Sequence, residues 1–152
     1  MRVLIAEDNP DLRHIFKVAF TRFDYEVVIA EDGQEALDLL AETKPDLLVL
    51  DINMPRVTGL EVLQRVRARP DMKHMKVMIV TGNVIAGNSP EAEAADLLLI
   101  KPVSLYDLIK LAERLLTPLQ PAVPALTPIE TRLVAQERIN ETTSRPTAAA
   151  AH

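Results

Sequence analysis

Four positions in this sequence carry polar side chains directly after a short apolar run. They hold an acidic pair, a single aspartate, a hydroxyl and a lysine: Glu7-Asp8, Asp51, Thr81 and Lys101. Neighbouring carboxylates repel each other and raise one another's pKa unless a cation lies between them. Oxygen-only ligands select a hard ion. Three carboxylates are few ligands, which suits Mg²⁺, because this ion keeps several water ligands and also binds a phosphate of the substrate. Lysine and threonine side chains bind phosphate oxygens. These residue types therefore predict a magnesium and phosphate site, provided that the fold brings them together.

Five apolar runs predict the strands that would bring these residues together: Val3–Ala6, Val27–Ala30, Leu47–Leu50, Val77–Val80 and Leu97–Ile100. A segment with helical apolar spacing follows each run, which gives a strand and a helix repeated five times. This alternation is typical of a parallel sheet covered on both faces, with right-handed crossovers. We therefore expect an α/β fold with a doubly wound, five-stranded parallel sheet in three layers, α/β/α. Ligands of such sheets bind at the carboxyl ends of the strands, where the four polar positions would meet.

Helix-start signals support this division of the chain. Four starts are predicted: Asn9 before Pro10, Asp32 with Glu35, Thr58 with Glu61, and Ser104. The first helix carries apolar residues at helical spacing: Leu12, Ile15, Phe16, Ala19 and Phe23. The fourth helix is the weak one. The segment after Thr81 is predicted to be short and irregular, and only Pro90–Ala95 has a helical pattern.

Composition divides the chain at residue 117. Four prolines begin the second part, which has no glycine or aromatic residue: Pro118, Pro121, Pro124 and Pro128. We expect residues 1–117 to form one domain and residues 118–152 to be a proline-rich linker and mostly disordered tail, compatible with a short helix over 128–140.

Charge and hydropathy exclude several classes of function. The net charge of −5 belongs to residues 1–117, because the arginines and glutamates of 118–152 cancel. An acidic domain is a poor match to a phosphate backbone, so no direct DNA binding is expected. The chain has no cysteine, no signal-like start and no run long enough to span a bilayer, so we expect a cytoplasmic protein without membrane contact.

The combined pattern of Glu7-Asp8, the segment from Asp51 to Gly59, Thr81 and Lys101-Pro102 resembles the receiver domain of bacterial two-component response regulators. The resemblance covers residues 1–117 and implies a flavodoxin-like fold. It implies that Asp51 is the phosphoacceptor and that Thr81 and Lys101 bind the phosphoryl oxygens. It assigns Mg²⁺ to four ligands: Glu7 (usually Asp in the family), Asp8, Asp51 and the backbone carbonyl of Asn53. Such a domain is no enzyme in the usual sense, although it catalyses its own phosphorylation and dephosphorylation.

The resemblance also implies partners. The phosphoryl group would come from a sensor histidine kinase or a phosphotransfer protein. Because no DNA-binding or catalytic module is evident after residue 117, output would pass through contact with an unnamed protein target or through a relay. Phosphorylation-dependent dimerisation is compatible with this type of protein. Leu98 stands where the family usually has an aromatic residue that follows Thr81 inward, so we expect intact input chemistry and an unusual output surface.

Structural roles are expected for the remaining residues near the motif. Pro55 and Gly59 would shape the loop after Asp51, and Met54 would pack. Proline at 102 makes a cis bond to Lys101 accessible, and a cis bond would turn the chain sharply. We expect His14 to be a surface or helix-packing residue.

Three alternatives compete with the receiver. A phosphatase of the haloacid-dehalogenase type generally needs a second aspartate two residues after the nucleophile, and here that residue is Asn53. A flavodoxin-type FMN protein needs a hydroxyl- and glycine-rich phosphate loop, which the acidic segment after the first run is not. The third is a pseudo-receiver, a protein-interaction module that is never phosphorylated. It typically lacks the acidic pair, the aspartate or the lysine, all of which are present here.

Overall fold

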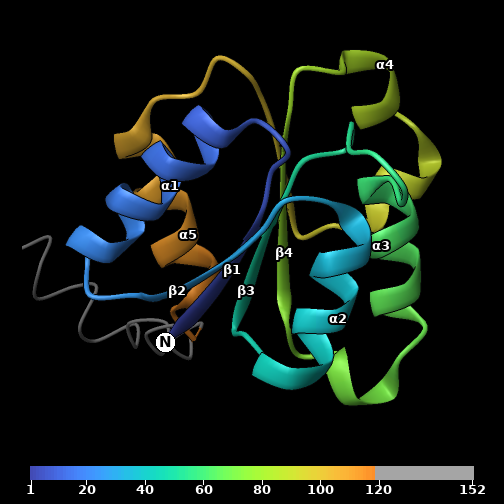
Figure 1. The fold of residues 1–152 in the computed structure, drawn as a ribbon, viewed down its shortest axis with the longest axis horizontal. Helices are drawn as coiled ribbons and strands as arrows, with labels where there is room; N and C mark the ends of the chain where they lie inside the picture. Colours follow the sequence, from blue (N-terminus) through green and yellow to red (C-terminus); the bar gives the residue numbers. More distant parts are fainter. Residues whose placement is uncertain (119–152) are drawn as a thin grey trace, which may run out of the picture. The chain divides into compact units, whose positions relative to one another are not determined.

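The five apolar runs form the five strands of one parallel sheet. The computed structural model describes residues 1–118, and Figure 1 shows their arrangement. The strands are β1 (Arg2–Ala6), β2 (Glu26–Ala30), β3 (Leu47–Leu50), β4 (Lys76–Thr81) and β5 (Leu97–Ile100). Their order in the sheet is β2-β1-β3-β4-β5, and all neighbours are parallel. This is the doubly wound, flavodoxin-like sheet that the sequence predicted.

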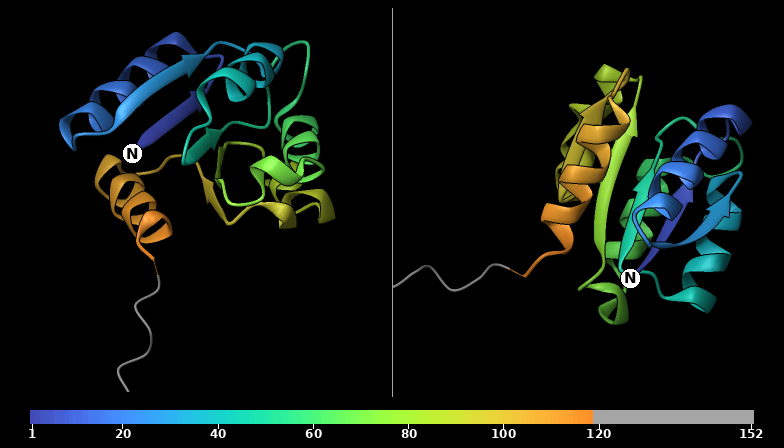
Figure 2. Two further views of the ribbon diagram at one scale, coloured as in Figure 1. Left: turned by 90° about the horizontal axis from the view of Figure 1, so that it is seen from below. Right: turned by 90° about the vertical axis from the view of Figure 1, so that its left-hand side faces the viewer.

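Helices cover both faces of the sheet, because alternate strand residues point to opposite sides. Leu4, Leu48 and Ile79 pack on the face covered by α2 (Gly33–Thr43) and α3 (Gly59–Arg67). Ile5, Val49 and Met78 pack on the face covered by α1 (Pro10–Arg22) and α5 (Leu105–Leu116). Figure 2 shows the resulting three layers from two further directions.

The predicted caps are present at all four helix starts. Asn9 Oδ1 accepts the backbone N–H groups of Asp11 and Leu12 at 3.0 and 3.1 Å. Thr58 and Glu61 form a reciprocal capping box, and Asp32 and Ser104 cap α2 and α5. These bonds satisfy backbone donors that have no partner inside the helix. The helices therefore begin at the residues that the local sequence specifies.

The buried side of α1 differs from the predicted apolar stripe. Phe20 is fully buried and packs edge to face against Tyr25, with ring centroids 5.5 Å apart. Phe23 is 49% exposed and Ile15 is 42% exposed. Phe23 lies beyond the last helical residue, where the backbone leaves the helical conformation, so helical spacing no longer sets its direction. Phe16, Ala19 and Phe20 provide the contact with the sheet.

The fourth crossover is short, as predicted, but its helical parts differ from the expectation. A single turn, α4 (Val84–Gly87), begins directly after Asn83, whose side chain caps it through the Ala86 N–H at 3.0 Å. The pattern at Pro90–Ala95 yields the 3₁₀ helix η2 (Pro90–Ala94), not an α-helix. A second 3₁₀ helix, η1 (Pro70–Met72), follows α3. The five residues of η2 allow too few i→i−4 hydrogen bonds to favour an α-helix over a 3₁₀ helix.

Several smaller expectations are met within the described residues. Met54 is buried, His14 is exposed, and the Lys101-Pro102 peptide bond is cis. Within residues 1–118, no helix combines the length and the apolar composition that a bilayer crossing requires. The predicted linker and tail over 118–152, with the short helix over 128–140, lie outside the described residues except for Pro118.

Candidate functional site

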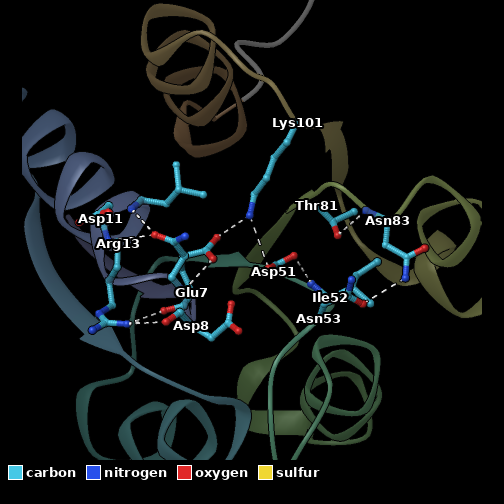
Figure 3. Close-up of polar contacts among 12 residues, drawn as sticks. Glu7, Asp8, Asp11, Arg13, Asp51, Ile52, Asn53, Thr81, Asn83 and Lys101 are labelled. Atoms are coloured by element: carbon cyan, nitrogen blue, oxygen red, sulfur yellow. Dashed lines mark hydrogen bonds and ion pairs between the residues drawn. The ribbon is translucent and has the colours of Figure 1, made fainter.

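The strand register places the predicted site residues at one edge of the sheet. Ala6 pairs with Leu50, so Glu7 and Asp51 follow at the ends of adjacent strands. The Asp51 N–H donates to the Ala6 carbonyl at 3.0 Å, which extends the ladder to this residue. The Lys101 N–H donates to the Thr81 carbonyl at 2.9 Å in the same way. Figure 3 shows the side chains of all four strand ends together.

Three carboxylates gather at this edge. Glu7, Asp8 and Asp51 each offer an oxygen atom, and these atoms lie within 4.8 Å of one another. Glu7 is 2% exposed and Asp51 is 7% exposed, whereas Asp8 faces solvent. The donors are all oxygens, and the open side at Asp8 leaves room for water, so the residues fit a hard, partly hydrated cation such as Mg²⁺.

Lys101 provides the positive charge of the cluster. Its ammonium Nζ donates to Glu7 Oε2 at 2.7 Å and lies 3.5 Å from Asp51 Oδ2. The other Glu7 oxygen accepts the Asn9 N–H at 3.2 Å, and Asp51 Oδ1 accepts the Ile52 N–H at 2.8 Å. Both buried carboxylates are thus held on one oxygen by backbone and on the other by Lys101.

Glu7 has the perturbed ionisation of the group. Burial raises the pKa of Glu7 above its ordinary value of 4.5, and the negative charge of Asp51 acts in the same direction. The hydrogen bond and charge of Lys101 oppose this rise without cancelling it. A metal cation beside these carboxylates, in addition to the Lys101 ammonium, would lower the free-energy cost of keeping them ionised.

Thr81 and Asn53 lie on the side of Asp51 that is opposite to Glu7 (Figure 3). Thr81 is fully buried, and its Oγ1 accepts the Asn83 N–H at 3.2 Å. The Asn83 side chain donates to Asn53 Oδ1 at 3.1 Å, which links the loop after β3 to the loop after β4. The predicted site residues therefore lie around Asp51 in Figure 3: Glu7, Asp8, Asn53, Thr81 and Lys101.

Comparison with known proteins gives the family and the fold. The sequence matches the family described as "Response regulator receiver domain" over residues 3–113. The chain belongs to this family. Receiver domains are phosphoacceptor signalling domains of two-component systems, and their fold is the one found here. The high-resolution structure of the chemotaxis response regulator CheY4 of Vibrio cholerae superposes on this receiver domain with a TM-score of 0.70 at 29% identity, covering 75% of this chain and 97% of that one.

Other relatives combine the receiver domain with further sequence. The response regulator MprA of Mycobacterium avium is 35% identical over 80% of this chain, which spans 53% of that protein. The sensor histidine kinase TmoS of Ectopseudomonas mendocina is 34% identical over 70% of this chain, which spans 11% of the kinase. This chain thus covers about half the length of its curated response-regulator relatives or less.

A crystal structure of the response regulator TrrA from Thermotoga maritima in complex with Mg²⁺ and BeF has a TM-score of 0.70 at 31% identity, covering 75% of this chain and 97% of that one.

Two arginines of the receiver domain that sequence reasoning did not single out also contact the site loops. Arg13 Nη1 donates to the carbonyl oxygens of Glu7 and Asp8 at 2.9 and 3.3 Å. Arg56, in the loop after Asp51, pairs with the buried Asp32. Each arginine stands five positions after an acidic site residue, which is the only local signal that could have drawn attention to them.

Proposed function

We propose that this receiver domain accepts a phosphoryl group on Asp51 from the phosphohistidine of a sensor histidine kinase or phosphotransfer protein. The observation that carries the proposal is the contact of the Lys101 ammonium with both Glu7 and Asp51 at the carboxyl edge of the sheet. A carboxylate nucleophile beside a fixed cation is the arrangement that phosphoryl transfer needs, because the reaction depends on alignment and charge neutralisation.

In the proposed reaction, an Asp51 carboxylate oxygen attacks phosphorus while the phosphorus–nitrogen bond to the donor imidazole breaks. The bonding electron pair leaves with the imidazole nitrogen, and Asp51 becomes an acyl phosphate. Lys101 and Thr81 bind the phosphoryl oxygens. Hydrolysis of the acyl phosphate would reverse the modification.

The proposed metal ligands are Glu7, Asp8, Asp51 and the backbone carbonyl of Asn53. When bound, Mg²⁺ supplies positive charge for the phosphoryl oxygens. The carboxylate cluster supports this assignment, and so does the Mg²⁺ and BeF complex of the related TrrA. Lys101 contacts two of the same carboxylates, so it would share them with the cation.

We further propose that the output is contact with a downstream protein, in the cytoplasm, with phosphorylation-dependent dimerisation as one form of that contact. The acidic charge of residues 1–117 argues against direct DNA binding by this domain. The competing function is the pseudo-receiver, which would bind partners without phosphorylation. The retained acidic pair, aspartate and lysine favour the phosphorylated form.

The test is intact-mass analysis after incubation with Mg²⁺ and acetyl phosphate. We expect one phosphoryl adduct in the wild type and none in Asp51→Asn, which keeps the shape and the backbone contacts of the side chain but removes the nucleophile. Omission of Mg²⁺ should also abolish the adduct. A folded wild-type protein that gives no adduct with this donor or with a phosphorylated histidine kinase would identify a pseudo-receiver.

A further inference from the structure

The turn that joins β2 to α2 contributes no group to the proposed chemistry. We refer to Glu31-Asp32-Gly33 as the β2–α2 turn, and to residues 51–58 as the Asp51 loop. The turn nevertheless contacts both segments that carry the proposed metal ligands: the β1–α1 segment with Glu7 and Asp8, and the Asp51 loop with Asn53. Three separate interactions make these contacts.

The first interaction runs through Arg13 on α1. Its Nη1 donates to two successive carbonyl oxygens, those of Glu7 and Asp8, at 2.9 and 3.3 Å. Its Nη2 pairs with Glu31 Oε1 at 3.2 Å, and the Arg13 side chain is 12% exposed. The guanidinium therefore fixes the backbone that aims the two carboxylates, while Glu31 orients the guanidinium.

The second interaction is the ion pair between Arg56 and Asp32. Asp32 is buried, caps α2 through the Glu35 N–H at 2.9 Å, and accepts the Arg56 guanidinium with its second oxygen. Arg56 has a φ of 66°, in the left-handed region, which costs a residue with a Cβ about 1 kcal/mol or more. Glycine would relieve that cost but could not pair with Asp32.

The third interaction brings backbone against backbone. A Cβ on Gly33 would lie 2.0 Å from the Val57 carbonyl oxygen, so only glycine allows the Asp51 loop to lie this close to the turn. Arg56 and Val57 are thus both held by the β2–α2 turn, three and four residues after Asn53.

Both ion pairs join one buried and one exposed side chain. Glu31 and Arg56 are each 69% exposed, and ion pairs with such exposed groups contribute little by themselves. The Asp32 side chain is the more deeply buried partner, 5% exposed against 12% for Arg13, and it also caps α2. The Asp32–Arg56 pair is therefore the one to test.

We propose that Asp32 and Arg56, assisted by Arg13, are positioning residues for the metal site. They fix the two ligand-bearing segments against the β2–α2 turn and so set the affinity for Mg²⁺. This inference rests on the proposed function. It assigns a role to residues that touch neither the cation nor the phosphoryl group.

The test uses Arg56→Gly and Asp32→Asn in the full chain. Glycine adopts the left-handed backbone without strain but cannot pair with Asp32, and asparagine still caps α2 but has no charge. Arg69→Ala is the matched control, because it removes an arginine from an exposed ion pair with Asp71 outside the site. Calorimetric titration with Mg²⁺ alone measures affinity without any phosphodonor.

We expect both variants to raise the dissociation constant for Mg²⁺ about tenfold, as loss of groups that orient metal ligands generally does. The double variant should be no weaker than either single variant, because both remove the same pair. With acetyl phosphate, the Mg²⁺ concentration for half-maximal rate should rise by the same factor, while the rate at saturating Mg²⁺ stays unchanged. The control should match the wild type.

Wild-type affinity in both Arg56→Gly and Asp32→Asn would overturn the inference, and so would a loss of rate at saturating Mg²⁺ with unchanged affinity. The proposed function fails separately, if the wild type binds Mg²⁺ but forms no adduct. A wild type that binds no Mg²⁺ overturns both.

Discussion

Lys101 illustrates how one side chain can serve two states of the same site. In the present structure its ammonium lies against Glu7 and Asp51 and compensates two buried carboxylates. In the proposed phosphorylated state it would bind a phosphoryl oxygen. A lysine suits this change of partner because its ammonium is a compact charge on a flexible stem.

Replacing Lys101 by alanine should separate metal binding from phosphoryl transfer. The lysine shares two carboxylates with the proposed cation, so its removal should tighten Mg²⁺ binding by roughly 1 kcal/mol, the order of one partly exposed charge interaction. The same change should slow adduct formation from acetyl phosphate by at least about a hundredfold, on the scale of a lost electrostatic stabiliser. Calorimetry and intact-mass time courses measure the two effects. Weaker Mg²⁺ binding in Lys101→Ala would show that the lysine organises the carboxylates and does not compete for them.

Glu7 allows a prediction about pH. Its pKa is raised by burial, so its ionisation destabilises the folded protein. The penalty is absent below the unfolded value near 4.5 and grows as the pH rises through the higher folded pKa. Glu7→Gln should therefore increase the free energy of unfolding by about 1 kcal/mol at pH 7 without metal, and by close to nothing at pH 4.

Urea unfolding in a chelator at the two pH values measures this difference, with exposed Glu42→Gln as the control. A lower stability of Glu7→Gln at pH 7 would mean that the ion pair with Lys101 outweighs the cost of burial. Mg²⁺ affinity should fall in the same variant, which is the functional reason to keep a destabilising carboxylate.

At the scale of single elements, helix caps decide where the loops of the site begin and end. The Asp51 loop ends at the capping box of Thr58 and Glu61, and Gly59 then packs directly on the Asp51 backbone. A Cβ on Gly59 would lie 2.0 Å from the Asp51 carbonyl oxygen. The start of α3 is therefore part of what holds Asp51 in place.

Thr58→Ala should lower the free energy of unfolding by about 1 kcal/mol, because the Glu61 N–H loses its acceptor. Thr58→Ser keeps the hydroxyl and should restore most of that loss. Thr21→Ala is the control, since the Thr21 hydroxyl donates only to the carbonyl of Lys17 within α1. Chemical denaturation of the three variants provides the comparison, and equal stability of Thr58→Ala and wild type would show that water replaces the cap.

At the scale of the whole molecule, the domain divides into a well-packed sheet and a lightly held fourth crossover. The central strands β1, β3 and β4 are almost completely buried. By contrast, α4 is one turn long, and Ile85 on it is 88% exposed. Segments with few buried apolar contacts open most easily, so we expect a response to the proposed phosphorylation at α4.

We therefore expect the amide exchange of residues 82–95 to change when Mg²⁺ and a beryllofluoride mimic are added, while β1 and β3 stay protected. The link would run from Thr81 through the Asn83 cap of α4, because Leu98 lacks the aromatic ring usual at that position. Hydrogen–deuterium exchange with mass spectrometry measures this, and Asp51→Asn with the same additives is the control. Unchanged exchange over 82–95 would exclude a switch at this crossover.

The sequence alone determined the strands, most of the helices and the chemistry of the strand ends. Apolar runs of four residues and cap residues such as Asn9 and Thr58 act locally, so the strands, the helix starts and the parallel α/β class could be predicted. Chain order then placed Glu7, Asp51 and Lys101 at one edge, because parallel strands end on the same side.

Only the tertiary structure decided which side chains meet across loops. Phe20 and not Phe23 is buried because the end of α1 sets the direction of the chain, and the Asn83–Asn53 contact joins residues 30 positions apart. Arg56, with its backbone in the left-handed region, meets Asp32 of the β2–α2 turn across 24 positions. Such contacts depend on loop geometry and on packing between distant segments, and neither leaves a periodic signal in the sequence.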